Sequence, residues 1–377
     1  MRGIRNQFNL KTKIVMGRGS LETLKTVSGH RAMIVADKMM EDLGYLTKVV
    51  TDLEEAGLST KVFTEVKPDP DTKVIAAGIH VYQAFQPDVI VAIGGGSAID
   101  AAKGIFYGAQ MSQETSRPYI IAIPSTSGTG SEVTDFSVIT VEDQKVVIVD
   151  ESLSPDLAIL DATCISTVPQ RVAVDTGLDV LTHATEAYVA TNGTDFTDAL
   201  AEKAIKLIFD HLPVLYEDSD NHVSRDRVHN ASCLAGIAFN NAGLGIIHSL
   251  SHALGGRFHL PHGRCNALLL EEVIRYNADL VGEGKTAAAE KYAQLAKVLG
   301  LPARTVREGV VSYLDAVGQL KKQLGVESSL EDLPIDLATF KDAVPQLAEI
   351  ALGDRCTPTN PVQPTQEALE KIYHRLY

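Results

Sequence analysis

The chain has 377 residues, a length that favours two domains because a single hydrophobic core rarely grows so large. Hydrophobic residues make up 45% and charged residues 22%, and the formal net charge of -14 argues against binding nucleic acid or an acidic membrane. We find no apolar run long enough for a membrane span and no signal peptide. The four cysteines form no CxxC pair, which is typical of reduced thiols in a cytoplasmic protein.

The first part of the chain alternates short apolar strands with amphipathic helices. This alternation predicts an α/β domain with a parallel sheet and helices on both faces. We expect helices at 20–28, 45–57 and 72–85. Strands are expected at 13–17, 31–37, 59–66, 88–95, 119–125 and 157–160, with a hairpin over 137–150 that turns at Glu142–Gln144.

After about Val168 and Pro169 the pattern changes to long segments with a period of 3.6 residues. These segments predict an all-helical second domain. We therefore expect an α/β domain over 1–168 and an all-α domain over 169–377. The expected helices of the second domain lie at 172–190, 197–212, 225–243, 246–256, 265–280, 285–300 and 306–325.

A glycine turn joins the strand at 88–95 to an alanine-rich helix through Gly94, Gly95, Gly96 and Ser97. Glycine lets a backbone approach a ligand closely, and the start of the helix offers free N–H groups that suit a pyrophosphate. The turn differs from the GxGxxG dinucleotide fingerprint. A tight strand–helix turn without a ligand is the alternative interpretation.

A second polar loop follows the strand at 119–125 and contains Ser125, Thr126 and Thr129. Loops at the carboxyl ends of parallel strands lie where α/β sheets bind ligands, although an ordinary surface loop has a similar composition. Asp37 ends the strand at 31–37, where a carboxylate can bind ribose hydroxyls and repel a 2′-phosphate. By position alone, a helix N-cap is the commoner use of such an aspartate.

Aspartate and histidine residues in the second domain have the spacing of metal ligands. Asp179 and His183 are four residues apart, as are His248 and His252, and residues four apart share one helix face. His262 follows in a segment expected to be a loop. One carboxylate and three imidazoles can hold a divalent metal and leave a position open for substrate. A single histidine is more often a satisfied core residue, but this grouping favours a metal site.

These motifs resemble the iron-dependent (group III) alcohol dehydrogenases, and the similarity runs nearly from end to end. The resemblance implies that Asp179, His183, His248 and His262 are the metal ligands, and that His252 lies beside the nicotinamide and the substrate. It is carried by GGGSAIDAAKG, PSTSGTGSEVTDFSVIT, SPDLAILD, GLDVLTHATEAY and HSLSHALGGRFHLPHGRCNALLL.

The resemblance also implies where the cofactor binds. Asp37 becomes a selector for NAD, because some relatives that use NADP have glycine there. Lys145 is implied to lie near the cofactor ribose. The implied phosphate loop comprises Gly94, Gly95, Gly96 and Ser97, completed by Asp100 and Lys103, and the loop on the nicotinamide side comprises Ser125, Thr126 and Thr129.

The pattern is most similar to the subgroup that acts on short primary alcohols. It implies reversible oxidation of an alcohol to its aldehyde with NAD, assisted by Fe2+, while the ligand set would also accept Zn2+. His252 would relay the proton. We expect a homodimer in the cytoplasm or inside a bacterial microcompartment.

Three alternatives stay open. Glycerol dehydrogenase and dehydroquinate synthase have a similar architecture, but a lyase for a phosphorylated sugar acid needs clustered cations, and only Arg257 and Arg264 lie near the ligands. A non-catalytic nucleotide- or metal-binding module is the third. Two departures from the family pattern are expected to be harmless. Ser249 and Ser251 should not touch a ligand, and Glu271 should affect only a helix start.

Overall fold

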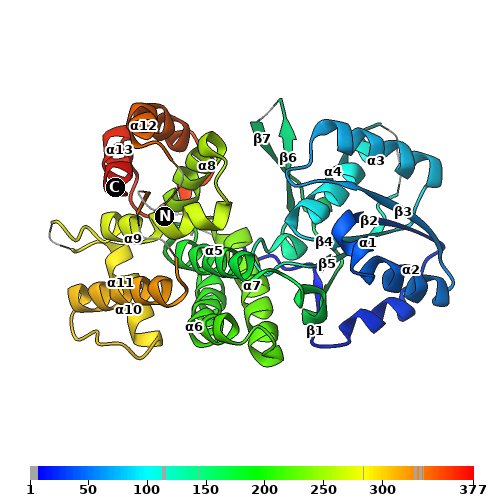
Figure 1. Ribbon diagram of the computed structural model, residues 1–377, viewed down its shortest axis with the longest axis horizontal. Coiled ribbons are helices and arrows are strands. Elements are labelled where there is room, and N and C mark those ends of the chain that lie inside the picture. Colours follow the sequence, from blue (N-terminus) through cyan, green and yellow to red (C-terminus); the bar gives the residue numbers. More distant parts are fainter. Residues whose placement is uncertain are drawn as a thin grey trace. The chain divides into compact units, whose positions relative to one another are not determined.

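The computed structural model describes residues 7–112, 116–142, 144–282, 284–326, 329–330, 333 and 335–377. The chain divides into two compact units, one of which is Asn9–Val168 (Figure 1). The other is Pro169–Tyr377, joined by the described N-terminal residues Gln7 and Phe8. The ring of Phe8 stacks on Phe196, with centroids 5.5 Å apart, so an aromatic contact ties these first residues to the helical unit.

A six-stranded parallel sheet in the order β1-β8-β5-β4-β2-β3 forms the centre of the first unit, as predicted. A separate antiparallel hairpin joins β6 and β7, and residue 143 of its expected turn lies outside the described residues. The strands are β1 Lys13–Met16, β2 Arg31–Asp37, β3 Ser59–Val66, β4 Val89–Gly94, β5 Tyr119–Pro124, β6 Phe136–Val141, β7 Gln144–Val149 and β8 Leu157–Leu160.

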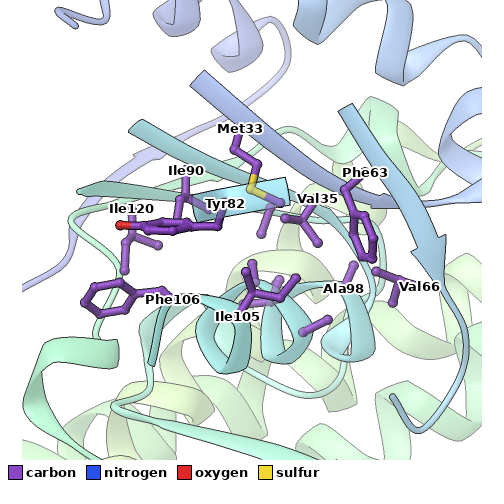
Figure 2. Close-up of a cluster of buried hydrophobic side chains, with 14 of the residues drawn as sticks. Met33, Val35, Phe63, Val66, Tyr82, Ile90, Ala98, Ile105, Phe106 and Ile120 are labelled. Atoms are coloured by element: carbon purple, nitrogen blue, oxygen red, sulfur yellow. The ribbon is translucent and has the colours of Figure 1, made fainter. Parts of the chain in front are cut away.

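Helices cover both faces of the sheet, because successive side chains of a strand point to opposite faces. On one face, Met33 and Ile90 join a buried cluster with Ile105 of α4 (Figure 2). On the other face, the neighbouring residues Ile34 and Val91 belong to a second buried cluster. The first cluster packs under α3 (Thr72–Phe85) and α4 (Gly96–Ser112), and the second under α2 (Tyr45–Glu55) and η1 (Ser20–Thr26).

The helix expected at 20–28 is the short 3₁₀ helix η1, a tighter form than the amphipathic α-helix that the pattern suggested. Its start is fixed from a distance, because the Asp161 carboxylate accepts the backbone N–H groups of Gly19 and Leu21 at 2.9 and 3.2 Å. The remaining short elements of this unit are α1 (Lys38–Asp42), η2 (Ser131–Val133), η3 (Glu151–Leu153) and η4 (Ala162–Ile165).

The described residues from Pro169 onward form helices and no strand. Helix α5 is central, since it packs against α6, α7 and α9 and is buried continuously from Gly177 to Val189. The last two α-helices were not predicted, in part because Pro345 interrupts the pattern of α12. The elements are α5 Gln170–Val189, α6 Asp195–Glu217, α7 His222–Ala242, α8 Ile246–Phe258, α9 His262–Asn277, α10 Ala287–Val298, α11 Val306–Gln323, α12 Leu337–Leu352, η6 Thr357–Thr359 and α13 Gln366–His374.

None of the described helices is by itself long and apolar enough to cross a membrane. Only α7 and α8 taken together reach that length and composition, and they are bent by 107° at their junction.

Candidate active site

Helix α5 supplies a buried carboxylate at the centre of the predicted metal site. Asp179 is only 4% exposed, and His183, one turn later, lies with its Nε2 atom 3.8 Å from Asp179 Oδ1. A carboxylate withdrawn from water is costly unless other groups compensate its charge. The donors around Asp179 therefore decide what this site can hold.

Two further imidazoles reach the same carboxylate oxygen from other helices. His248 Nε2 on α8 lies 3.8 Å from Asp179 Oδ1, and His262 Nε2 on α9 lies 3.6 Å from it. The ligand atoms of Asp179, His248 and His262, here called the three-donor group, all lie within 4.8 Å of one another. Donors around a tetrahedral ion with bonds of about 2.1 Å are about 3.4 Å apart, so a small inward movement would fit a metal.

His183, the fourth predicted ligand, lies beside the three-donor group. Its ring stacks on that of His248, with centroids 4.6 Å apart. The expected loop position of His262 is wrong, since His262 is the first residue of α9 and follows Pro261. Burial holds the pKa of His248 well below the usual value, and desolvation together with the neighbouring histidines lowers the pKa of the partly exposed His262 in the same direction. Both are therefore neutral imidazoles, the form that binds metals.

Glu186, which was not predicted as a site residue, positions His248. Its Oε2 atom accepts the Nδ1 proton of His248 at 2.5 Å, while Oε1 accepts the backbone N–H of Ile247 at 2.6 Å. A carboxylate on Nδ1 fixes the tautomer that leaves Nε2 free to bind a metal. The signal in the sequence was spacing, because positions 179, 183 and 186 share one face of a helix.

Asn266 was also missed, although it lies one turn after His262 on α9. Its Nδ2 atom donates to Asp179 Oδ1 at 2.7 Å and lies 3.2 Å from Nε2 of both His248 and His262. The side chain is fully buried. The amide nitrogen therefore faces all three donors, and its two N–H groups can serve two of them at a time.

His252 does not join the three-donor group. Its Nδ1 atom lies 2.8 Å from Asp354 Oδ2, and its ring stacks on His262 with centroids 5.3 Å apart. Because a carboxylate only accepts, Nδ1 carries the proton and Nε2 is left as an acceptor. Asp354, in the turn after α12, was not predicted, since its partner is 102 residues away in sequence.

The residues at both departures from the family pattern, which were expected to be harmless, make specific contacts in the structure. Ser251 Oγ lies 3.4 Å from Nδ1 of His262, so the expectation that it touches no proposed ligand is wrong. Glu271 lies inside α9 and forms a 2.7 Å ion pair with the buried Lys321, so it is not at a helix start. Helix packing, which the local sequence does not reveal, gives both side chains their partners.

In the first unit, the predicted cofactor residues come together at the carboxyl ends of the adjacent strands β2, β4 and β5, here called the carboxyl edge. Gly94 pairs in register with Pro124, and the backbone N–H of Ser125 donates to the Gly94 carbonyl at 2.8 Å. A Cβ atom at Gly96 would lie 2.7 Å from Thr129 Cγ2. The glycine turn therefore packs directly on the loop after β5 that carries Ser125, Thr126 and Thr129, here called the hydroxyl loop.

Asp37 has two uses at the carboxyl edge. Its Oδ1 atom accepts the backbone N–H of Met40 at 3.1 Å, which makes it the N-cap of α1. Its Oδ2 atom points to the glycine turn, where a Cβ atom at Gly94 would lie 3.0 Å away. The cap therefore leaves one carboxylate oxygen over the turn.

Asp100 and Lys103 anchor the hydroxyl loop to α4. Lys103 is fully buried, and its Nζ atom donates to the carbonyls of Ser131, Thr134 and Phe136 at 2.7, 2.8 and 2.9 Å. Asp100 Oδ1 accepts the Ser131 hydroxyl at 2.6 Å. These residues shape the loop, so the cationic end of Lys103 is committed to the protein backbone.

Lys145 and Ser97 are linked through Asp69, which was not predicted as a site residue. Lys145 Nζ forms a 2.8 Å ion pair with Asp69 Oδ1, and the backbone N–H of Asp69 donates to Ser97 Oγ at 3.4 Å. The hairpin residue Lys145 is thereby connected to the first turn of α4.

Two family models match almost the whole chain. The model described as iron-containing alcohol dehydrogenase matches residues 11–162, and the model for the C-terminal part of the Fe-containing alcohol dehydrogenase family matches residues 173–377. The 1-propanol dehydrogenase PduQ of Salmonella typhimurium is 42% identical over 375 residues, which cover 98% of this chain and 100% of that protein.

Two other similar proteins differ in length. The aldehyde-alcohol dehydrogenase of Streptococcus pneumoniae serotype 2 is 41% identical over 404 residues, covering 98% of this chain and 46% of that protein. The chain thus spans about half the length of this curated relative. The solved structure of an iron-containing alcohol dehydrogenase from Thermococcus thioreducens has a TM-score of 0.90 and 35% identity, covering 98% of this chain and 99% of that chain.

Replacing Glu186 by glutamine should weaken metal binding by about 10- to 100-fold, because the amide keeps the shape but removes the charge that holds the Nδ1 proton of His248. Competition with a chelator of known affinity, under anaerobic conditions, measures the change. Glu217→Gln, at an exposed position of α6, is the matched control and should leave affinity unchanged. Equal affinities in the two variants would contradict the assigned role of Glu186.

Proposed function

Since the chain belongs to the iron-containing alcohol dehydrogenase family, we propose that it interconverts a short primary alcohol and its aldehyde, with NAD as hydride carrier. The observation that carries this proposal is the convergence of Asp179, His248 and His262 on one point of a helical unit. In the other unit, the carboxyl edge has the glycine turn and polar loop that suit a dinucleotide. The similarity to a 1-propanol dehydrogenase supports a short primary alcohol as the substrate class.

We propose that Asp179, His183, His248 and His262 hold one divalent ion. The ion supplies Lewis-acid chemistry toward the alcohol oxygen. Glu186 keeps His248 in its binding tautomer, and Asp179 is the one carboxylate among these four ligands. Fe2+ is proposed from the family, and Zn2+ would fit the same nitrogen and oxygen donors.

His252 is proposed to relay the proton of the alcohol. Its Nδ1 atom donates to Asp354, which leaves Nε2 as the atom that accepts a proton. The side chain is 38% exposed, so a proton on it can pass on to water. Asp354 keeps the ring in one orientation, and this supports a directed transfer.

NAD is proposed to bind at the carboxyl edge, with its pyrophosphate at Gly94–Ser97 and the start of α4. Contacts within the protein account for Gly94 and Gly96, but a Cβ atom at Gly95 would meet nothing closer than 3.5 Å. Close approach of a ligand would account for glycine at position 95. Asp37 would bind the ribose, Lys145 would lie near it, and Ser125, Thr126 and Thr129 would lie on the nicotinamide side.

The alternative activities have less support. Arg264, one of the two cations near the proposed ligands, forms a 2.7 Å ion pair with the buried Asp175. It is therefore engaged and cannot serve a phosphorylated substrate without breaking that pair, which disfavours a dehydroquinate-synthase-like lyase. Glycerol-dehydrogenase-like oxidation of a secondary alcohol, and binding without catalysis, are outcomes that a substrate panel would reveal. The homodimer and the cytoplasmic or microcompartment localisation stay predictions.

His262→Ala should lose bound metal and lower NAD-dependent oxidation of 1-propanol by at least about 1,000-fold, because it removes one donor from the metal site. Metal content and NADH formation are measured together on protein purified anaerobically. His222→Ala, at an exposed position at the start of α7, is the control and should retain both. Full metal content and turnover in His262→Ala would refute the ligand assignment.

Asp37→Ser should shift the cofactor preference toward NADP by at least about 10-fold, since it removes the charge that repels a 2′-phosphate. Serine is also a good N-cap, so α1 should keep its stability. The ratio of kcat/KM for the two cofactors measures the shift, and the Tm reports the cap. An unchanged ratio at an unchanged Tm would exclude Asp37 as the selector.

A further inference from the structure

A second group of metal-ligating side chains lies beside the three-donor group and has a different chemistry. The ligand atoms of His252, Asp354 and Cys356 all lie within 4.8 Å of one another. This set combines one imidazole, one carboxylate and one thiol. The ligands proposed for the metal site at Asp179, here called the first centre, include no sulfur. Imidazole, carboxylate and thiolate are all ligands of zinc-class ions.

Hydrogen bonds of Asp354 and of its neighbour Thr357 hold the second group in place. Asp354 Oδ1 accepts the backbone N–H of Cys356 at 2.8 Å and the hydroxyl of Ser249 at 3.3 Å. The hydroxyl of Thr357 donates to Ser249 at 2.8 Å, which ties the turn after α12 to α8. The three ligating side chains are therefore held together by buried and partly buried hydrogen bonds between two segments.

The position of His252 makes one side of this group accessible to an ion. His252 is partly exposed, while Cys356 is buried. The Nδ1 atom of His252 and Oδ2 of Asp354 are 2.8 Å apart, closer than two donors on one ion, so a cation would enter by separating this pair slightly. As the metal binds, the thiol proton would leave to solvent, and the Nδ1 proton of His252 would move through water to Nε2, so that Nδ1 can ligate.

We propose that His252, Asp354 and Cys356 form a second, inhibitory site for a soft or borderline divalent cation such as Zn2+. Occupation binds Nδ1 of His252 to the cation and leaves the ring proton on Nε2, so the histidine can no longer accept the proton of the alcohol. Sulfur favours Zn2+ over Mg2+ or Fe2+. The binding site stands on its geometry alone, and only its inhibitory effect rests on the proposed alcohol dehydrogenase activity.

Titration of the iron-loaded protein with Co2+ tests the site directly. Thiolate–Co2+ charge-transfer absorption in the near ultraviolet reports sulfur ligation, and none of the donors proposed for the first centre is sulfur. We expect one additional equivalent of metal and this absorption in the unmodified protein, with loss of both in Cys356→Ser. Cys265→Ser, which removes a buried thiol of α9, is the control and should retain both.

Inhibition by Zn2+ is measured on the same proteins with 1-propanol and NAD. Loss of an outer-shell partner already costs about 10- to 100-fold in metal affinity, so Cys356→Ser should weaken inhibition by at least about 10-fold. Asp354→Asn, assayed for Co2+ binding only, guards against misfolding of the cysteine variant and should also lose the additional equivalent. Absence of that equivalent, or absorption that persists in Cys356→Ser, overturns the proposal. If the protein proves inactive, the absorption still decides whether the site exists.

Discussion

The helical unit is organised around one buried anion, the carboxylate of Asp179. Burial of such a charge is unfavourable unless donors or a cation surround it. His183 approaches from the same helix, His248 from α8 and His262 from α9, all with Nε2 within 3.8 Å of one oxygen. Asn266 adds a direct hydrogen bond at 2.7 Å. The crossing of α5, α8 and α9 is therefore tied to the charge that a divalent ion would neutralise.

The α/β unit contains a buried charge of the opposite sign. Lys103 is fully buried, and its contacts with backbone carbonyls hold the loop after β5 against α4. That loop then packs on Gly96, and both lie at the ends of neighbouring parallel strands. In each unit, a charge in the interior fixes the segment that carries the candidate site. A fixed segment presents its polar groups to a ligand without further ordering.

Much of the fold was predictable, because strands buried on both faces are continuous apolar runs. The bounds of β2, β3 and β8 agree with the expected ranges at every residue. The spacing of Asp179 with His183 and of His248 with His252 also identified the helices that carry the site. Glu186 and Asn266 were missed because a polar residue inside a helix pattern resembles a solvent-exposed one, and Asp354 was missed because it follows a helix that was not predicted. The hydrogen-bond partners of these three side chains depend on how helices far apart in the sequence pack against one another. Helix α12 was not predicted because Pro345 interrupts its helical pattern.

The central claim is that a single ion is bound by Asp179 and the histidines around it. Diffraction from crystals of the Fe2+-loaded protein at the iron absorption edge tests this most directly. We predict one anomalous peak within about 2.0 to 2.3 Å of an Asp179 carboxylate oxygen and of Nε2 of His183, His248 and His262. A peak bound by other residues, or no peak in protein that oxidises an alcohol, would contradict the account.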